Sequence, residues 1–207
     1  MNTPQPPLNF WDQNYASEGY KYGTAPNAFL TEQAWRLPAA APVLLPGDGE
    51  GRNGVWLARR GHPVTTVDSS RIGVAKARSL AQEAGVTMQA LCADLADWQP
   101  PRQAFAGLVL TYLHLPPGLR GEVHPRLAEA LAPDGWLILE AFHPRQLDYA
   151  SGGPKAAEML YSLDLLRGDF GSHLEEVFAW EGEVRLDEGP GHQGAAWVTR
   201  WVARKPA

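Results

Sequence analysis

The sequence has little cysteine and no cluster of positive charge. Cys92 is the single cysteine among 207 residues, so the chain can form no internal disulfide and no thiolate cluster for a metal. Its apolar surroundings favour a buried, inert thiol over a nucleophile. The formal net charge is −5, and lysines and arginines nowhere gather among aromatic residues. We therefore expect neither a metal site nor a nucleic-acid partner.

Long apolar runs are absent as well. No stretch reaches the length that spans a bilayer, and residues 1–7 contain neither the positive n-region nor the apolar h-region of a signal peptide. These absences predict a cytoplasmic protein without a membrane partner. They leave the oligomeric state open.

The length favours one domain. A chain of 207 residues can build one α/β core but is too short for two ordinary domains with a linker, so residues 1–207 are predicted to form a single domain. The proline-rich residues 1–9 are expected to be a flexible tail. Residues 10–37 follow as an N-terminal region that includes a helix, with Asn27 as its N-cap.

Short apolar runs alternate with helical patterns over most of the chain. Strands are predicted at 43–46, 63–68, 87–94, 105–111 and 136–142, and helices at 54–60, 70–84, 125–131 and 157–166. Alternation through the first five strands predicts an α/β fold with a doubly wound, parallel sheet and helices on both faces. The last two runs, 177–186 and 195–204, have no helix between them and are expected to pair antiparallel at the sheet edge.

The strongest local pattern is a glycine-rich turn after the first strand. Gly47, Gly49 and Gly51 stand at alternate positions, and a helical pattern follows at once. Without Cβ atoms these residues can adopt positive φ and bring bare backbone, together with the free N–H groups of a helix start, against a ligand. The pattern favours a nucleotide-like ligand. Residues 49–54 also satisfy the G-x-G-x-x-G pattern of dinucleotide sites, which is weak evidence alone.

Two acidic residues decide between these ligands. Asp68 ends the second predicted strand and Asp94 ends the third, so both are expected beside the glycine turn at the carboxyl edge of the sheet. Asp68 lies about 20 residues beyond the glycines, where a carboxylate can accept hydrogen bonds from ribose hydroxyls. Asp94 could meet an adenine amino group while Leu95 packs on the ring.

The N-terminal region is rich in aromatic and turn residues. Trp11 and Tyr22 belong to two such runs, 10–15 and 20–27. One interpretation makes the region a set of surface turns pinned by aromatic rings. The other makes it a lid over a pocket, with Trp11 closing the site. Both stay open at this point.

These elements resemble the class I S-adenosylmethionine-dependent methyltransferases. The matching segments are the glycine turn, residues 67–69, residues 93–95 and the turn at 131–137. The segments 22–27, 49–53 and 114–117 are similar to the tellurite-resistance and thiopurine methyltransferase-like branch. The resemblance implies a three-layer Rossmann-like fold with a seven-stranded sheet, and S-adenosylmethionine as the cofactor. It implies a cofactor site of Trp11, Tyr22, Gly47, Asp48, Gly49, Glu50, Gly51, Arg52, Asn53, Asp68, Ser69, Asp94, Leu95 and Thr111.

One position departs from the family pattern. The family usually has an acid two residues before the first glycine, where it helps to hold the methionine end of the cofactor, and this chain has Leu45 followed by Pro46. Either Asp48 or Glu50 is expected to bind the cofactor amino group instead, or the affinity is reduced.

The implied reaction is an in-line displacement on a methyl group. A small soft acceptor such as tellurite, selenite or a thiol needs little acid–base help, because positioning alone can supply about 7 to 11 kcal/mol of the barrier. We therefore expect no dedicated catalytic dyad. Polar residues near the later strand ends are expected to position the acceptor: Tyr112, His114, His143, Arg145 and His192.

Two other functions compete with methyl transfer. An NAD(P)-dependent oxidoreductase would use the G-x-G-x-x-G pattern, but Asp94 has no evident task in a dinucleotide site and the chain has little room for a substrate domain. A non-catalytic protein that binds S-adenosylmethionine is the second alternative, and Leu45 is the residue that supports it.

Overall fold

The computed structural model describes residues 9–207. Residues 1–8, most of the predicted tail, lie outside the described residues, and Asn9 is the N-cap of the first helix, α1 (Phe10–Tyr15). Within residues 9–207 no helix is both long and apolar enough to cross a membrane.

One sheet of seven strands organises the chain, in the order β3-β2-β1-β4-β5-β7-β6. The first five strands run parallel and β7 is antiparallel to both of its neighbours. The bounds are β1 (Val43–Pro46), β2 (Val64–Asp68), β3 (Gln89–Cys92), β4 (Phe105–Thr111), β5 (Leu131–Phe142), β6 (Glu175–Asp187) and β7 (Gln193–Arg204). The predicted doubly wound sheet with a C-terminal antiparallel pair is confirmed, and its strand order reverses between β1 and β4.

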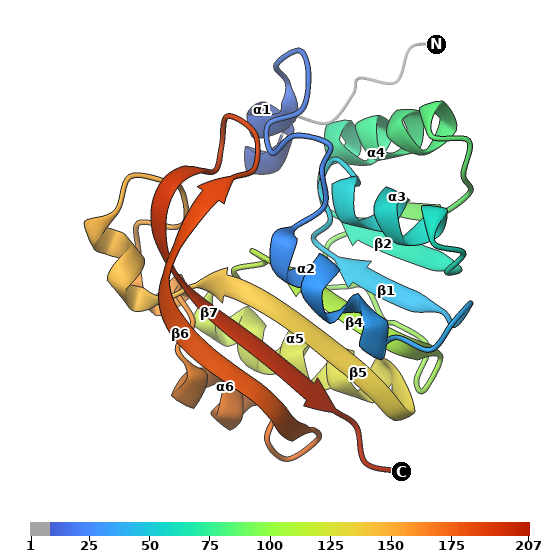
Figure 1. Cartoon of the computed structure of the whole chain (residues 1–207), viewed down its shortest axis with the longest axis vertical. Helices are drawn as coiled ribbons and strands as arrows, with labels where there is room; N and C mark the ends of the chain where they lie inside the picture. Colours follow the sequence, from blue (N-terminus) through green and yellow to red (C-terminus); the bar gives the residue numbers. More distant parts are fainter. Residues whose placement is uncertain (1–8) are drawn as a thin grey trace.

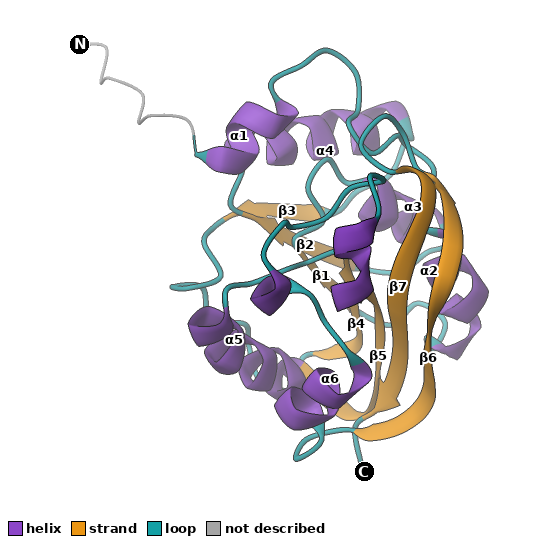
Figure 2. Ribbon diagram, turned by 90° about the vertical axis from the view of Figure 1, so that its left-hand side faces the viewer, coloured by secondary structure: helices purple, strands orange, loops and turns teal. Residues whose placement is uncertain are grey.

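Helices cover both faces of this sheet. Figure 2 shows α5 and α6 on one side of the strands and α2 and α3 on the other. The bounds are α2 (Ala28–Gln33), α3 (Arg52–Arg59), α4 (Arg71–Glu83), α5 (Pro117–Ala130) and α6 (Leu163–Phe170), with short 3-10 turns at η1 (Ala34–Arg36), η2 (Pro144–Asp148) and η3 (Ala157–Met159). Figure 1 shows the β6–β7 hairpin reaching the N-terminal segment near α1.

Alternating side chains of the central strands fill the two cores. On β4, Leu108 and Leu110 pack on the α5 side, whereas Val109 packs on the α2 side. Ile138 of β5 joins Val109, and all four side chains are at most 2% exposed. Burial on both faces explains why these strands read as unbroken apolar runs in the sequence.

Two predicted helices have different bounds. Helix α5 begins at Pro117 and not at Pro125, which lies inside it. Proline is well suited to a first helical turn because its N–H would be unpaired there anyway, and Pro117 occupies that place. The helix predicted at 157–166 is also wrong, because η3 ends at Met159 and α6 begins only at Leu163.

Two further differences concern strands. The predicted turn at 133–135 lies within β5, as an irregularity where Asp134 has φ 64°. Cys92 is exposed, so the prediction of a buried thiol is wrong. It ends β3, the edge strand, whose outer side has no neighbouring strand to cover it.

Candidate active site

A cavity of about 640 Å³ opens at the carboxyl ends of the parallel strands. Its wall combines the turns after β1, β2 and β4 with α1 and the tip of the β6–β7 hairpin. Figure 1 shows α1 and that hairpin at the same edge of the sheet. The volume lies in the range of small-molecule and cofactor sites, and the position is the switch point where open α/β sheets bind ligands.

The glycine turn has the predicted backbone, but only its first glycine faces the cavity. Gly47, Gly49 and Gly51 have φ values of 69°, 55° and 90°. Gly47 lines the cavity, whereas a Cβ on Gly49 would lie 2.5 Å from the Tyr15 hydroxyl and one on Gly51 would lie 2.6 Å from the Ala77 Cβ. Two of the three glycines therefore let helices pack against the turn.

Asp68 connects the second strand to the glycine turn. Its carboxylate accepts hydrogen bonds from the backbone N–H of Gly49 (2.9 Å) and of Ser70 (2.8 Å), and it lines the cavity. Burial raises the pKa of Asp68, while these two bonds lower it. A carboxylate has about four acceptor positions, so it can still accept bonds from a ligand.

Asp94 and Leu95 extend this rim on the side of β3. The Asp94 side chain is exposed, lines the cavity and accepts a hydrogen bond from Ala96 N–H (2.9 Å). Leu95 is 8% exposed and lines the cavity as well. Ser69 and Thr111 complete the rim between these residues and the later strands.

Asp48 carries an unpaired oxygen at the centre of the turn. Its Oδ2 accepts a bond from Gly54 N–H (3.0 Å), but its buried Oδ1 has no hydrogen-bond partner among the described residues. Burial raises the pKa of Asp48 to about 7. Since Asp48 lines the cavity, its carboxylate is available to a cationic ligand.

Glu50 is held away from the cavity. It accepts bonds from Lys21 N–H (2.7 Å) and Lys76 Nζ (2.8 Å) and does not line the wall. Arg52 and Asn53 do line it. Asp48 is thus the acid of this turn that faces the cavity.

The N-terminal helix covers the turn. Trp11 stacks on Tyr15 with ring centroids 5.6 Å apart, and both residues line the cavity, as does Tyr22. Asp12, 3% exposed, fixes the helix by accepting bonds from the Ser70 hydroxyl (2.8 Å) and Ile72 N–H (3.1 Å). The region is thus pinned to the turn and also lines the cavity, as the two interpretations separately expected.

His114 lines the cavity, but its ring nitrogens are both occupied. Nδ1 lies 2.7 Å from the Met159 carbonyl oxygen, so it donates its proton there, and Nε2 accepts a bond from Phe142 N–H (3.2 Å). Burial lowers the pKa of His114 to about 4. The ring is therefore a neutral side chain that ties the end of β5 to η3.

Tyr112 lines the cavity and has an unusual backbone conformation. Its φ is 52°, a left-handed value that costs energy in a bulky residue and is found most often at functional sites. The hydroxyl donates a hydrogen bond of 2.6 Å to Glu140, which is 2% exposed. The ring faces Phe142 and His192, with centroids 4.6 and 4.5 Å away.

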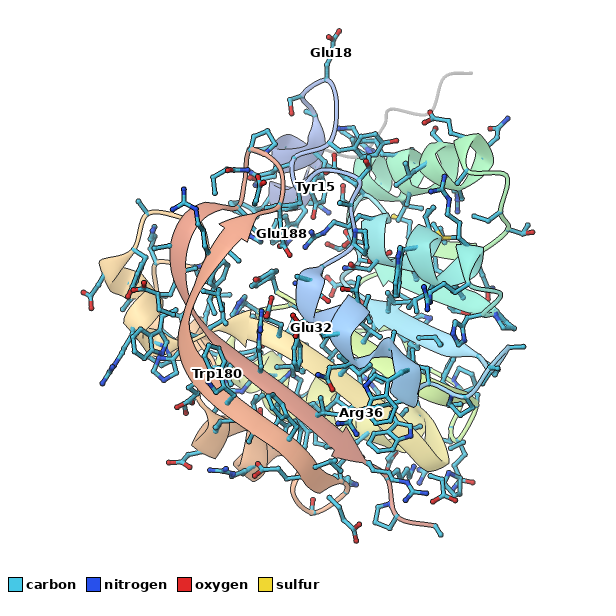
Figure 3. The ribbon with its side chains drawn as sticks, in the orientation of Figure 1. Tyr15, Glu18, Glu32, Arg36, Trp180 and Glu188 are labelled. Atoms are coloured by element: carbon cyan, nitrogen blue, oxygen red, sulfur yellow. The ribbon has the colours of Figure 1, made fainter. Side chains whose placement is uncertain are left out.

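His192 belongs to the hairpin tip and also lines the cavity. Its Nδ1 lies 3.4 Å from Glu188 Oε2, and the same carboxylate oxygen lies 2.9 Å from the Arg52 guanidinium. Asn27 donates a further bond to Glu188 (2.9 Å). Figure 3 shows Glu188 extending from the hairpin toward the N-terminal segment.

The structure does not bring His143 and Arg145 into the cavity. Nδ1 of His143 accepts a bond from Arg145 N–H (3.0 Å), and its Nε2 lies 3.6 Å from Glu181. Arg145 is exposed and its guanidinium lies 4.6 Å from the centre of the Trp197 ring. Both residues follow β5 as predicted, but η2 carries them around the outside of the wall.

Among the residues that sequence reasoning missed are Tyr15, Phe142 and the segment 152–156 on the cavity wall, and Glu140 and Glu188 behind it. The aromatic run at 10–15 was a signal for Tyr15. Glu188 stands four residues before His192, but its contacts with Arg52 and Asn27, like the contact of Glu140 with Asn27, span more than 100 positions and could not be seen in the sequence.

Fold and site together define a class of protein. A glycine turn after β1, an acid at the end of β2 and a second acid after β3 surround one cavity, on a sheet that ends in an antiparallel pair. This is the arrangement of class I S-adenosylmethionine-dependent methyltransferases. Residues 43–135 match the family described as "Methyltransferase domain". The chain thus carries a class I S-adenosylmethionine-dependent methyltransferase domain, which implies S-adenosylmethionine as its cofactor.

Solved structures share the fold at low sequence identity. A protein described with the conversion of a disulfide bond into a thioacetal group during echinomycin biosynthesis is 19% identical, with a TM-score of 0.74 over 95% of this chain and 91% of that one. TehB from Haemophilus influenzae is 18% identical, with a TM-score of 0.69 over 95% and 66%. A SAM-dependent methyltransferase from Methanosarcina mazei is 16% identical, with a TM-score of 0.67 over 88% and 99%. A search of curated proteins found no match.

Proposed function

We propose that this enzyme transfers a methyl group to a small-molecule acceptor bound among Tyr112, Phe142 and His192. The observation that supports this most is the continuity of one cavity, from the Asp68 and Asp94 rim to that aromatic end. When bound, S-adenosylmethionine supplies an electrophilic methyl group and leaves as a neutral thioether. The chain's part is to bind both reactants, align them and exclude water.

The residues of the rim fit the cofactor. Asp68 is placed for the ribose hydroxyls, Asp94 and Leu95 for the adenine, and Gly47 offers bare backbone. The unpaired Oδ1 of Asp48 fits the cationic amino group, and this assigns to Asp48 the task of the acid that Leu45 replaces. Trp11, Tyr15 and Tyr22 would close over the bound cofactor as a lid, within the N-terminal region 10–37.

Among soft acceptors, the cavity favours a thiol over tellurite or selenite. An oxyanion is held best by a buried, unpaired cation, but Arg52 is paired with Glu188, and the other two cations of the wall, Lys21 and Lys155, are half-buried and exposed, where water screens their charge. The neighbour described with a disulfide-to-thioacetal conversion concerns sulfur, which agrees with this choice. The aromatic rings of Tyr112, Phe142 and His192 would pack on an apolar part of the acceptor.

Calorimetric titration tests the proposal. The protein is titrated with S-adenosylhomocysteine and, separately, with NADH, and methyl transfer to thiols, selenite and tellurite is then measured. We expect micromolar binding of S-adenosylhomocysteine and no binding of NADH. Binding of NADH alone would support an oxidoreductase. Binding of S-adenosylhomocysteine without transfer to any acceptor would support the non-catalytic alternative.

The affinity for S-adenosylhomocysteine should depend on the ionisation of Asp48. Its pKa is raised to about 7 in the free protein, so the carboxyl group is protonated below that pH and cannot pair with an ammonium. We therefore expect affinity to fall as the pH drops from 8 to 6, up to about tenfold per unit below the pKa. Asp48→Asn should bind weakly at every pH. An identical pH profile in the wild type and Asp48→Asn would contradict this assignment.

A further inference from the structure

We propose that His192, oriented by Glu188, is the general base of the methyl transfer, and that the acceptor is a small molecule whose nucleophilic atom carries a proton at neutral pH. The inference rests on the proposed function, because it assigns chemistry within the same cavity. It replaces the expectation of a transfer without a catalytic dyad.

The position of the His192 ring supports this role. The residue is 4% exposed, and its ring centroid lies 4.3 Å from that of Tyr22, 4.5 Å from that of Tyr112 and 5.2 Å from that of Phe142. These rings line the same cavity. An acceptor bound among them therefore lies against His192.

The protons of His192 are fixed by its partner. A carboxylate only accepts hydrogen bonds, so the Nδ1 atom beside Glu188 must carry the proton and Nε2 must keep its lone pair. Among residues 9–207 no group forms a hydrogen bond with Nε2. His114, the other histidine among the described residues of the wall, has both nitrogens occupied. His192 is thus the ring able to accept a proton.

Burial keeps this ring neutral until a proton arrives. Burial lowers the pKa of His192 below its usual 6.5, Glu188 and Glu140 raise it, and Arg52 lowers it. His114, Tyr22 and Tyr112, the other titratable groups nearby, are neutral at pH 7, since the pKa of His114 is about 4 and those of the tyrosines are raised. Arg52 and Asn27 hold Glu188 in place.

The step balances with these groups. The lone pair of the acceptor atom forms a bond to the methyl carbon, the carbon–sulfur bond breaks with its electrons going to sulfur, and the acceptor proton passes to Nε2 of His192. The imidazolium is stabilised by Glu188 and later releases its proton to solvent. Each turnover releases one proton. Methyl transfer from the sulfonium needs no external oxidant or reductant.

The same geometry disfavours an acceptor that is already an anion. It would meet the lone pair of Nε2. The carboxylate of Glu188 lies behind the His192 ring, and that of Glu140 lies behind the Tyr112 hydroxyl. Arg52, the cation that acts on His192, already pairs with Glu188. A neutral thiol, amine or hydroxyl avoids this repulsion and provides the proton that the site can accept.

Two matched acceptors separate a base from a merely positioning residue. Phenylmethanethiol is an alkyl thiol like the cysteine side chain, whose pKa is about 8.5, so it is mostly protonated at pH 7. Thiobenzoate has a similar size but is an anion at this pH. We expect His192→Gln to lower kcat/KM for phenylmethanethiol by about 100-fold or more relative to thiobenzoate. His173→Gln, outside the cavity, should leave the ratio unchanged. An equal loss with both acceptors would overturn the role as a base.

Nuclear magnetic resonance of the His192 ring gives a readout without turnover. We expect a neutral Nδ1–H tautomer at pH 7, a pKa below 6.5, and a still lower pKa in Glu188→Gln, because Glu188 raises it. Adding phenylmethanethiol to the S-adenosylhomocysteine complex should shift the ring signals. Unchanged signals, or a ring protonated at pH 7, would overturn the inference. Failure of the wild type to bind S-adenosylhomocysteine would instead overturn the proposed function.

Discussion

Asp68→Ala is expected to weaken the binding of S-adenosylhomocysteine by about 100-fold or more. The carboxylate holds the turn through Gly49 and Ser70 and is assigned to the ribose hydroxyls, so the variant loses both a ligand contact and the shape of the rim. A hydrogen bond to a charged group contributes about 1.5 to 3 kcal/mol, and two such bonds to the ligand exceed a factor of 100. Calorimetric titration measures the change in Kd.

A control separates this effect from a general change in charge. Asp97 is an exposed aspartate close to Asp94, and Asp97→Ala should bind S-adenosylhomocysteine within about threefold of the wild type, as expected for a surface change. Asp68→Asn keeps the shape but loses the charge and should lie between the two. If Asp68→Ala bound as tightly as Asp97→Ala, the assignment of the ribose to Asp68 would be wrong.

The rim of the site could be predicted from the sequence because it depends on strand ends. Parallel strands of one sheet present their carboxyl ends at one edge, so Gly47, Asp68 and Asp94 had to come together once the alternation of strands and helices was recognised. The roles of Gly49 and Gly51 could not be predicted. Whether a glycine faces a ligand or a packed helix depends on where α1 and α4 lie.

The acceptor end was less accessible to prediction for a similar reason. Tyr112 and His192 were found as polar residues after strands, but their chemistry depends on Glu140 and Glu188, which reach them through the packing of β5 and the hairpin. His143, at a similar place after β5, lies outside the cavity because η2 turns the chain away. The sequence therefore predicts that a residue lies at the carboxyl edge of the sheet, but the conformation of the following loop decides whether its side chain enters the cavity.

A buried ionic network joins the acceptor end to the core. Glu140 on β5 accepts hydrogen bonds from Asn27 Nδ2 (2.7 Å), from the Tyr112 hydroxyl and from Arg200 on β7. Asn27 also bonds Glu188 and caps α2 through Leu30 N–H (2.9 Å). The network therefore ties the N-terminal region to the sheet and the hairpin, and it fixes the conformation of Tyr112.

Loss of the Glu140 charge is expected to lower the free energy of unfolding by about 3 kcal/mol. In Glu140→Gln, the shape is kept, but Arg200 and Asn27 lose their carboxylate partner inside the protein. Breaking a buried ion pair usually costs about 3 to 5 kcal/mol. We expect the lower value because the Arg200 side chain is 18% exposed. Urea unfolding of both proteins at pH 7 measures the difference.

Glu32 supplies a matched comparison, because it also approaches Arg200, at 3.9 Å, but with a side chain 57% exposed. An exposed ion pair contributes little, so Glu32→Gln should lower the free energy of unfolding by less than about 1 kcal/mol. The gap between the two variants isolates burial, since the arginine is the same. Equal losses in Glu140→Gln and Glu32→Gln would mean that the Glu140 network contributes no more than a surface pair, and Tyr112 would have to be held in its left-handed conformation by packing against Phe142 and His192 alone.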